Sequence, residues 1–292
     1  MSQTSDNLSL SSNKKFINQF FPVGFAIIIF FAIVGGFYAW ITALNLIPGQ
    51  KIALEIKLAD VLIGLTIYLK TAVDFALIIG LLMKNFPGLK NRLAIETGTA
   101  LGNALGTAII LLVWYFFKEI QWLLSAMVIL ASFVLLKLAK SSLEHVFEDH
   151  ESKDLPVWVV KSTHFLESFL NPINKFLHPV LSKIVPEMSF KAKGNEGFWT
   201  LVGASFTIPF ILGLDDFAGY VPLFNVVNVF GFGIGVFLGH CILNIFLFLN
   251  PGKTIEIVKN PIIAVIGSVV FIGLACWGLY EATHILIETY FH

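Results

Sequence analysis

Long apolar stretches separated by short polar clusters make up most of this chain. Each stretch is long enough to cross the hydrocarbon core of a bilayer, which takes about 20 apolar residues in a helix. The pattern therefore predicts an all-α integral membrane protein with about seven transmembrane helices. Their expected ranges are 21–44, 59–82, 93–117, 120–138, 198–223, 226–249 and 261–287.

The composition agrees with a membrane protein. Hydrophobic residues make up 57% of the chain and charged residues 13%, with a mean hydropathy of +0.82. A soluble domain is about half apolar and a quarter charged. The formal net charge of zero says nothing about partners; it is the distribution of the charges that matters. Cys241 and Cys276 both fall inside apolar stretches, which indicates small buried hydrophobes more than a disulfide.

The placement of basic residues predicts the orientation of the chain. With the N-terminus in the cytoplasm, fifteen of the nineteen Lys and Arg residues face the cytoplasm. Only Lys51, Lys57 and Lys118 then face outward, and Lys70 lies within a helix. Cytoplasmic loops of membrane proteins carry such an excess of Lys and Arg. We therefore expect a multi-pass protein of the cell inner membrane, with its N-terminus inside and its C-terminus outside.

The last six predicted helices resemble two copies of one three-helix unit. Asp74-Phe75-Ala76 in the second helix recurs as Asp216-Phe217-Ala218 in the fifth. The next helix of each unit carries glycines four residues apart, namely Gly98, Gly102 and Gly106 in one unit and Gly231, Gly235 and Gly239 in the other. An odd number of helices per copy inverts the second copy relative to the first. Inverted repeats are typical of secondary transporters, which bind their substrate at the midplane between the copies.

The chain is thereby divided into five parts. These are a cytoplasmic tail at 1–20, an added transmembrane helix at 21–44, a first repeat at 59–138, a cytoplasmic loop at 139–197 and a second repeat at 198–287. The loop is apolar on a helical rhythm with prolines between, which predicts short amphipathic helices on the membrane surface. Its acidic and histidine-bearing run from Glu144 to Asp154 either collects metal at the cytoplasmic mouth or is a solvated extension of the fourth helix.

Carboxylates deep inside the predicted helices are the main candidates for chemistry. Asp74 and Asp216 lie at depths where an ionised side chain costs several kcal/mol unless it is paired, protonated or facing water. Asp215 is a weaker candidate, because its side chain points about 100° away from that of Asp216 on a helix. Asn103 and His240 follow glycines at matching places in the two units.

Oxygen ligands suit divalent cations, and an imidazole adds softer metals. The residues expected to bind the ion are therefore Asp74, Asp215, Asp216, Asn103 and His240, of which all except Asp215 are the expected metal ligands. The same carboxylates could relay protons.

Lys70 precedes Asp74 by one helical turn, a spacing that places both on one face of a continuous helix. The ammonium would then neutralise the carboxylate when no cation is bound, which gives Lys70 a coupling role. In the alternative reading, Lys70 extends to the membrane interface.

Two motifs carry a family resemblance. Val73-Asp74-Phe75-Ala76, followed by Lys84, Pro87 and the glycine-rich third helix, resembles the TerC-like tellurium-resistance membrane proteins. The stretch from Leu214 to Phe224 resembles cadmium-resistance transporters of the CadD type. Both belong to the LysE superfamily of exporters. The resemblance implies a pair of inverted three-helix repeats over 59–287, with the first helix as an addition.

The chain departs from the pattern of these families at three positions. The asparagine usual after the aspartate is Phe75 in one repeat and Phe217 in the other, and Tyr68 stands near the place of an acidic residue. Each change removes an oxygen ligand.

The function expected from the sequence is secondary transport of a divalent metal cation, directed outward in exchange for protons. No phosphate-binding loop is present, so ATP coupling is not expected, and neither a Ser/His/Asp set nor a zinc-type His-Glu motif indicates an enzyme. No cofactor is expected, because the cation is the substrate. The expected partners are the lipid bilayer, a divalent cation and protons, and no nucleic acid. Two alternatives stay open: an exporter of a small organic solute or amino acid, and a membrane scaffold or assembly factor that transports nothing. A homo-oligomer is also left open.

Overall fold

A computed structural model describes residues 2–49, 51–148, 155–184, 197–221, 223–224, 227–258 and 260–291. These residues form helices joined by short turns, with no strand among them. Five helices are long and apolar enough to cross a membrane, and each coincides with a predicted span: Phe20–Leu44, Leu89–Phe117, Gln121–Glu144, Val229–Leu249 and Pro261–Glu288. The chain is therefore an all-helical, multi-pass membrane protein, as the apolar pattern predicted.

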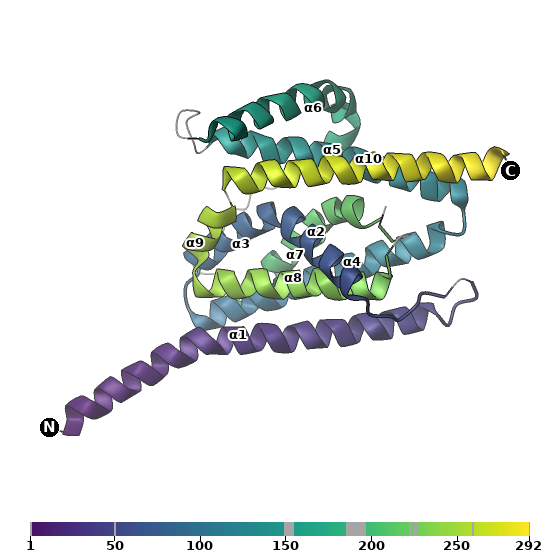
Figure 1. Ribbon diagram of the computed structural model, residues 1–292. Coiled ribbons are helices and arrows are strands. Elements are labelled where there is room, and N and C mark those ends of the chain that lie inside the picture. Colours follow the sequence, from purple (N-terminus) through teal and green to yellow (C-terminus); the bar gives the residue numbers. More distant parts are fainter. Residues whose placement is uncertain are drawn as a thin grey trace.

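The first helix, α1 (Ser2–Leu44), packs against the rest of the bundle through its C-terminal half. Its main neighbour is α8 (Val229–Leu249), where Phe37 lies so close to Gly233 that a Cβ on the glycine would be 2.3 Å from the phenyl ring. The Trp40 indole donates a hydrogen bond to the Ala108 carbonyl at 3.2 Å. Figure 1 shows α1 along one side of the molecule, at the bottom of the view.

The second predicted span is not one helix. The structure has α2 (Leu58–Thr71) and α3 (Val73–Asn85), joined at Ala72, whose ψ is 12°. The Thr71 hydroxyl lies 3.2 Å from the carbonyl oxygens of both Ile67 and Tyr68. Such side-chain bonds to preceding carbonyls compete with the helix ladder and bend helices. The prediction of an uninterrupted helix over 59–82 was therefore wrong.

The helices α4 (Leu89–Phe117) and α5 (Gln121–Glu148) are joined by a short turn, as predicted, but make few contacts with each other. Instead α4 packs along α7 (Phe198–Tyr220), and α5 packs along α10 (Pro261–Phe291). The helices α4 and α5 are thus neighbours in the sequence, but neither is the other's main packing partner. Both main partners come from the other half of the chain.

Glycines bring α4 and α7 together. A Cβ on Gly98 would lie 2.1 Å from the Ser205 hydroxyl oxygen, and one on Gly102 would lie 2.7 Å from Pro209. Because residue numbers rise together along the contact, the two helices are parallel. Small residues let helix backbones approach to this distance inside a membrane.

The pair α2 and α8 is built in the same way. A Cβ on Gly235 would lie 2.0 Å from the Val61 carbonyl oxygen, and one on Gly239 would lie 2.7 Å from the Tyr68 ring. This contact also runs in parallel. The helix α2 also contributes a glycine to this contact, because a Cβ on Gly64 would lie 2.1 Å from the Phe232 carbonyl oxygen of α8.

Within the loop predicted at 139–197, the described residues 155–184 hold one long helix, α6 (Val157–Ile184), where short helices were expected. It packs antiparallel along the second half of α5: His164 stacks on Phe147 with ring centroids 5.4 Å apart, and the Asn174 amide donates to the Leu136 carbonyl at 3.4 Å. Pro172 and Pro179 lie within α6 and do not end it, although proline lacks a backbone N–H donor; packing along α5 supports the helix there.

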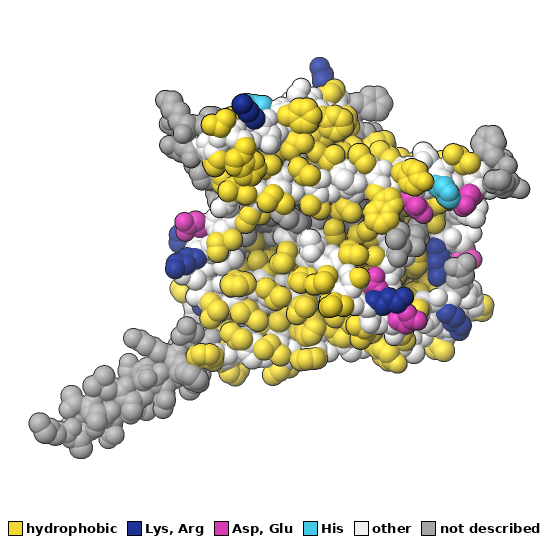
Figure 2. All heavy atoms as spheres, viewed as in Figure 1, with side chains coloured by type: hydrophobic (Ala, Val, Ile, Leu, Met, Phe, Trp, Pro, Cys, Tyr) yellow, Lys and Arg dark blue, Asp and Glu magenta, His cyan; other side chains and the backbone are white. Residues whose placement is uncertain are grey.

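The short helix α9 (Pro251–Val258) connects α8 to α10 and packs on α3. Figure 1 shows that α5, α6 and α10 lie on the side opposite α1 and that α5 and α10 run antiparallel. On the face seen in Figure 2, hydrophobic side chains cover the middle of the bundle. Apart from those on α6, charged side chains gather at its two ends. A bilayer fits this arrangement, with its hydrocarbon core around the middle.

Candidate functional site

The predicted acidic residues lie at helix breaks and helix ends. Asp74 is the second residue of α3, directly after the break at Ala72, and Lys70 belongs to the last turn of α2. Asp215 and Asp216 fall in the last two turns of α7. The side chains of these four residues lie outside the described part of the chain. Lys70 and Asp74 belong to two different helices. The continuous helix on which their predicted pairing was based is therefore absent, and the pairing itself stays a prediction.

His240 lies in the middle of α8 and is 2% exposed. Its Nδ1 is 2.9 Å from the Tyr68 hydroxyl of α2, and its Nε2 is 2.8 Å from Nδ2 of Asn244. An amide nitrogen only donates, so Nε2 accepts, and Nδ1 carries the proton that it donates to the tyrosine oxygen. Both ring nitrogens are therefore occupied. His240 can bind a metal only after Tyr68 or Asn244 moves away.

The hydrogen-bonded chain continues from α8 to α4. The same Asn244 amide lies 3.5 Å from the Thr99 hydroxyl, which donates to the Glu96 carbonyl at 3.0 Å. Three helices thus meet at one polar chain: α2 brings Tyr68, α8 brings His240 and Asn244, and α4 brings Thr99.

A stripe of buried polar side chains follows α4 through this region. Its members are 3% exposed or less and are Glu96, Thr99, Asn103 and Thr107. Spacings of three, four and four residues place them on one helix face, over about 16 Å at a rise of 1.5 Å per residue. Sequence reasoning singled out only Asn103. The helical spacing of polar residues within an apolar stretch was the signal that could have found the others.

Within this stripe, Glu96 is the residue whose side chain most lacks hydrogen-bond partners. Its side chain is fully buried, and neither carboxylate oxygen has a hydrogen-bond partner within the described chain. It lies close enough to Cys241 on α8 for the two groups to interact electrostatically. An ionised carboxylate in such a place costs several kcal/mol, so ionisable residues inside membranes are rare and usually functional. Asn244 Oδ1 and Asn103 Nδ2 also lack partners among the described residues.

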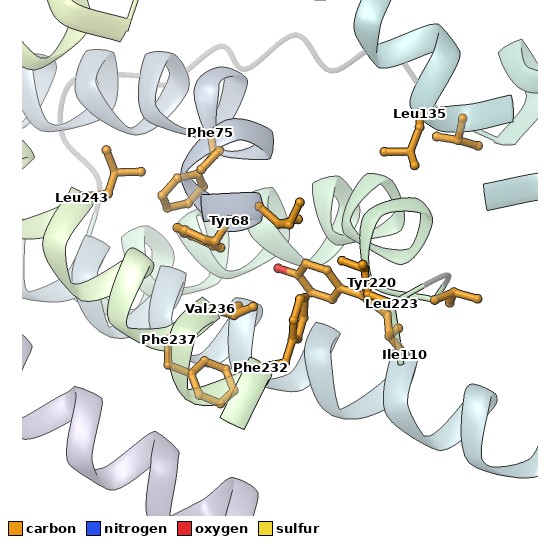
Figure 3. Packing of buried hydrophobic residues seen from close by; sticks show 14 of the residues in the cluster. Tyr68, Phe75, Ile110, Leu135, Tyr220, Leu223, Phe232, Val236, Phe237 and Leu243 are labelled. Atoms are coloured by element: carbon orange, nitrogen blue, oxygen red, sulfur yellow. The ribbon is translucent and has the colours of Figure 1, made fainter. Parts of the chain in front are cut away.

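Aromatic rings form a wall beside His240. The ring centroids of Tyr68 and Phe75 lie 5.9 Å and 5.8 Å from that of His240. Figure 3 shows these two rings close together, beside Leu243 and Val236 of α8. Phe75 is one of the departures that remove an oxygen ligand, and its apolar ring packs against the imidazole of His240.

A cavity of about 300 Å³ opens near the turn between α4 and α5. Lys51, Lys118, Phe224 and Asn228 are among its lining residues. Burial lowers the pKa of Lys118, and the negative charge of Glu119 opposes this shift. Two of the residues that line the cavity, Phe224 and Trp114, belong to an aromatic cluster. In it Phe224 contacts Trp114, Tyr220 and Phe232 at centroid distances of 5.4, 6.3 and 5.6 Å.

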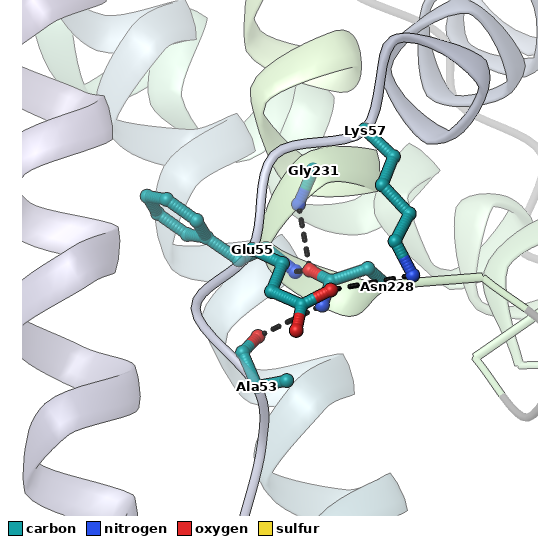
Figure 4. A network of polar contacts seen from close by, with 6 residues as sticks. Ala53, Glu55, Lys57, Asn228 and Gly231 are labelled. Carbon is teal, nitrogen blue, oxygen red and sulfur yellow. Dashed lines mark hydrogen bonds and ion pairs between the residues drawn. The ribbon is translucent and has the colours of Figure 1, made fainter.

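Asn228 fixes the beginning of α8 at this end. Its Oδ1 accepts from the backbone N–H groups of Phe230 and Gly231, both at 3.1 Å, and its amide donates to the Ala53 carbonyl at 3.1 Å (Figure 4). The ion pair between Glu55 and Lys57, at 3.2 Å, is largely exposed and contributes little stability. The cap ties α8 to the segment that precedes α2.

The described residues bring only part of the predicted metal site together. No group of three or more His, Cys, Asp or Glu residues converges among them. Asn103 and His240 are both buried, but the hydrogen-bonded chain through His240 reaches α4 at Thr99, one turn before Asn103. Comparison of the chain with protein-family models, curated proteins and solved structures found no match.

Proposed function

We propose that this protein is a secondary transporter that moves a divalent metal cation across the membrane, outward and in exchange for protons. In this proposal one added helix precedes two inverted three-helix units, and the site lies where the units cross. The observation that carries the proposal is the way in which the two halves of the chain pack.

Each unit pairs with the other in a reciprocal pattern. The first unit comprises α2 with α3, α4 and α5, and the second comprises α7, α8 and α10. The first helix of each unit packs in parallel on the second helix of the other, through the glycine contacts of α2 with α8 and of α4 with α7. The third helices, α5 and α10, pack on each other. Two copies related by a two-fold axis in the membrane plane produce this pattern.

Buried polar residues at the crossing support a transport site. The chain through Tyr68, His240, Asn244 and Thr99 joins three helices from both units. The stripe on α4 extends it along the helix axis. A scaffold needs no such stripe, and polar groups inside membrane proteins mark substrate and ion pathways.

The assignment of a divalent cation as the substrate rests on the sequence. Asp74 and Asp216 occupy matching places in the two units, and carboxylate oxygens are the ligands that divalent cations prefer. The resemblance to TerC-like and CadD-like exporters supports the same substrate class and remains part of the proposal.

The test is proton flux driven by Mn²⁺ in proteoliposomes. We expect the parent protein to release protons when Mn²⁺ is added, and Asp74→Asn and Asp216→Asn each to reduce the flux to that of protein-free vesicles. Each substitution keeps the shape of the side chain and removes its charge. The matched control is Glu55→Gln, because the Glu55 side chain is 61% exposed and its ion pair with Lys57 lies on the surface.

Two outcomes would contradict the proposal. Parent-like flux in both aspartate variants would remove these residues from the site. A parent protein that moves no Mn²⁺, but releases a radiolabelled amino acid from loaded vesicles, would favour the organic-solute exporter.

A further inference from the structure

We propose that Glu96 is the proton-binding residue of this transporter, at a coupling site separate from the aspartates that bind the cation. The inference deepens the proposed function, and the coupling role of Glu96 depends on that function. The binding of a proton by Glu96 rests on the geometry around its side chain alone.

No donor is bonded to the Glu96 carboxylate in the described chain. Its two oxygens are buried acceptors without a hydrogen-bond partner there, and so is Oδ1 of Asn244, whose amide nitrogen lies 3.5 Å from the hydroxyl of Thr99, three residues after Glu96. The Thr99 hydroxyl, one turn away, donates to the backbone carbonyl of Glu96 and so offers nothing to the carboxylate. A proton on the carboxyl group converts one acceptor into a donor. That single change relieves the mismatch between acceptors and donors.

The charged and titratable groups around Glu96 point to a proton more than to a metal ion. On α8 they are His240, held between Tyr68 and Asn244, and the Cys241 thiol. On α4, Arg92 is one turn earlier; its Nη1 donates to the Phe248 carbonyl at 2.7 Å, and its Nε is buried without a hydrogen-bond partner among the described residues. The segment of α7 that packs on α4 brings the Ser205 hydroxyl, which donates to Leu201. No second carboxylate side chain is described beside Glu96, whereas a divalent cation takes six or more oxygen ligands.

The position of Glu96 suits exchange with one side of the membrane. It is the eighth residue of α4, about 10 Å along the axis from the start of the helix at 1.5 Å per residue. Thr99, Asn103 and Thr107 continue the buried stripe toward the other end. Glu96 therefore lies nearest the end of α4 that the charge pattern assigns to the cytoplasm.

Infrared spectroscopy of the reconstituted protein over a pH series tests the proton site directly. We expect the parent to show the carbonyl-stretch band of a buried protonated carboxyl group, which disappears as the pH is raised. Glu96→Gln should lack this band, Glu96→Asp should keep it at a shifted frequency, and Glu55→Gln should match the parent. A band that persists in a folded Glu96→Gln variant, or a parent without any titrating band, would overturn the inference.

Two flux measurements on the same vesicles test coupling. One is Mn²⁺ uptake driven by a pH gradient, and the other is exchange of radiolabelled for unlabelled Mn²⁺ at equal pH on both sides. We expect Glu96→Gln to lose the gradient-driven uptake and keep the exchange, while Asp74→Asn loses both. Loss of exchange in Glu96→Gln would place Glu96 in the cation site and overturn the separation. If the parent shows neither flux, the proposed function fails, and the infrared titration still decides whether Glu96 binds a proton.

Discussion

At the scale of single residues, the site depends on hydrogen bonds that close inside the membrane. His240 was predicted as a metal ligand, yet its ring is held at both nitrogens, by Tyr68 of α2 and by Asn244 of α8. A buried imidazole with two partners has a structural role and is also a candidate ligand. The bond to Tyr68 joins α8 to α2, whereas the bond to Asn244 lies within α8.

The contribution of the hydrogen bond between Tyr68 and His240 to the stability of the fold can be measured with the Tyr68→Phe variant. The variant leaves the buried Nδ1–H of His240 without its acceptor, and a buried unsatisfied group costs about 1–3 kcal/mol. We expect the melting temperature of the purified protein in detergent to fall. Tyr38→Phe is the control, because Tyr38 is 50% exposed on α1. Equal melting temperatures for the two variants would show that the bond to His240 does not stabilise the fold.

At the scale of helices, small residues decide which pairs form. The glycine rows of α4 and α8 allow close packing against α7 and α2. At these contacts the neighbouring atoms include backbone oxygens, such as the Val202 carbonyl, which would lie 2.3 Å from a Cβ on Gly98. Backbone atoms cannot rotate away as a flexible side chain can. The row is not uniform, however, since Gly106 has nothing within 4 Å of its Cβ position.

This difference gives a matched pair of variants on one helix. Gly98→Ala should force α4 and α7 apart, at the upper end of the about 1–3 kcal/mol typical of overpacking, and reduce the yield of monodisperse protein. Gly106→Ala has open space and should behave like the parent. The measurement is size-exclusion chromatography with a thermal ramp. A Gly106→Ala variant as damaged as Gly98→Ala would show that glycine itself matters, through backbone conformation, and not the contact with α7.

At the scale of the whole molecule, the charges are distributed as a bilayer requires. Lys84, Lys90 and Lys253 lie at the end of the bundle where α3, α4 and α9 meet, and Lys51, Lys57 and Lys118 lie at the other end. The hydrophobic middle of the bundle separates these two groups (Figure 2). The proposed orientation assigns the first end to the cytoplasm, because Lys and Arg are in excess on that side.

Cysteine labelling tests this orientation at two exposed positions. In a background with Cys241→Ala and Cys276→Ala, we expect Lys51→Cys to react with a membrane-impermeant maleimide in intact cells. Lys90→Cys should react only after the membrane is permeabilised. Both side chains are exposed, so access to them depends on the membrane and not on burial. The reverse labelling pattern would invert the topology and with it the direction of transport.

The sequence by itself determined the membrane class and the five long apolar helices. Hydropathy, charge placement and glycine spacing are local properties, and each stretch carries its own preference for the bilayer. The tertiary structure decided which helices meet, because that choice depends on residues far apart, as with Tyr68 and His240, 172 positions from each other. It also placed the break at Ala72 and kept α6 in one piece. Only after folding is Glu96 enclosed without a partner, since an acid near the start of an apolar stretch reaches water unless another helix covers it.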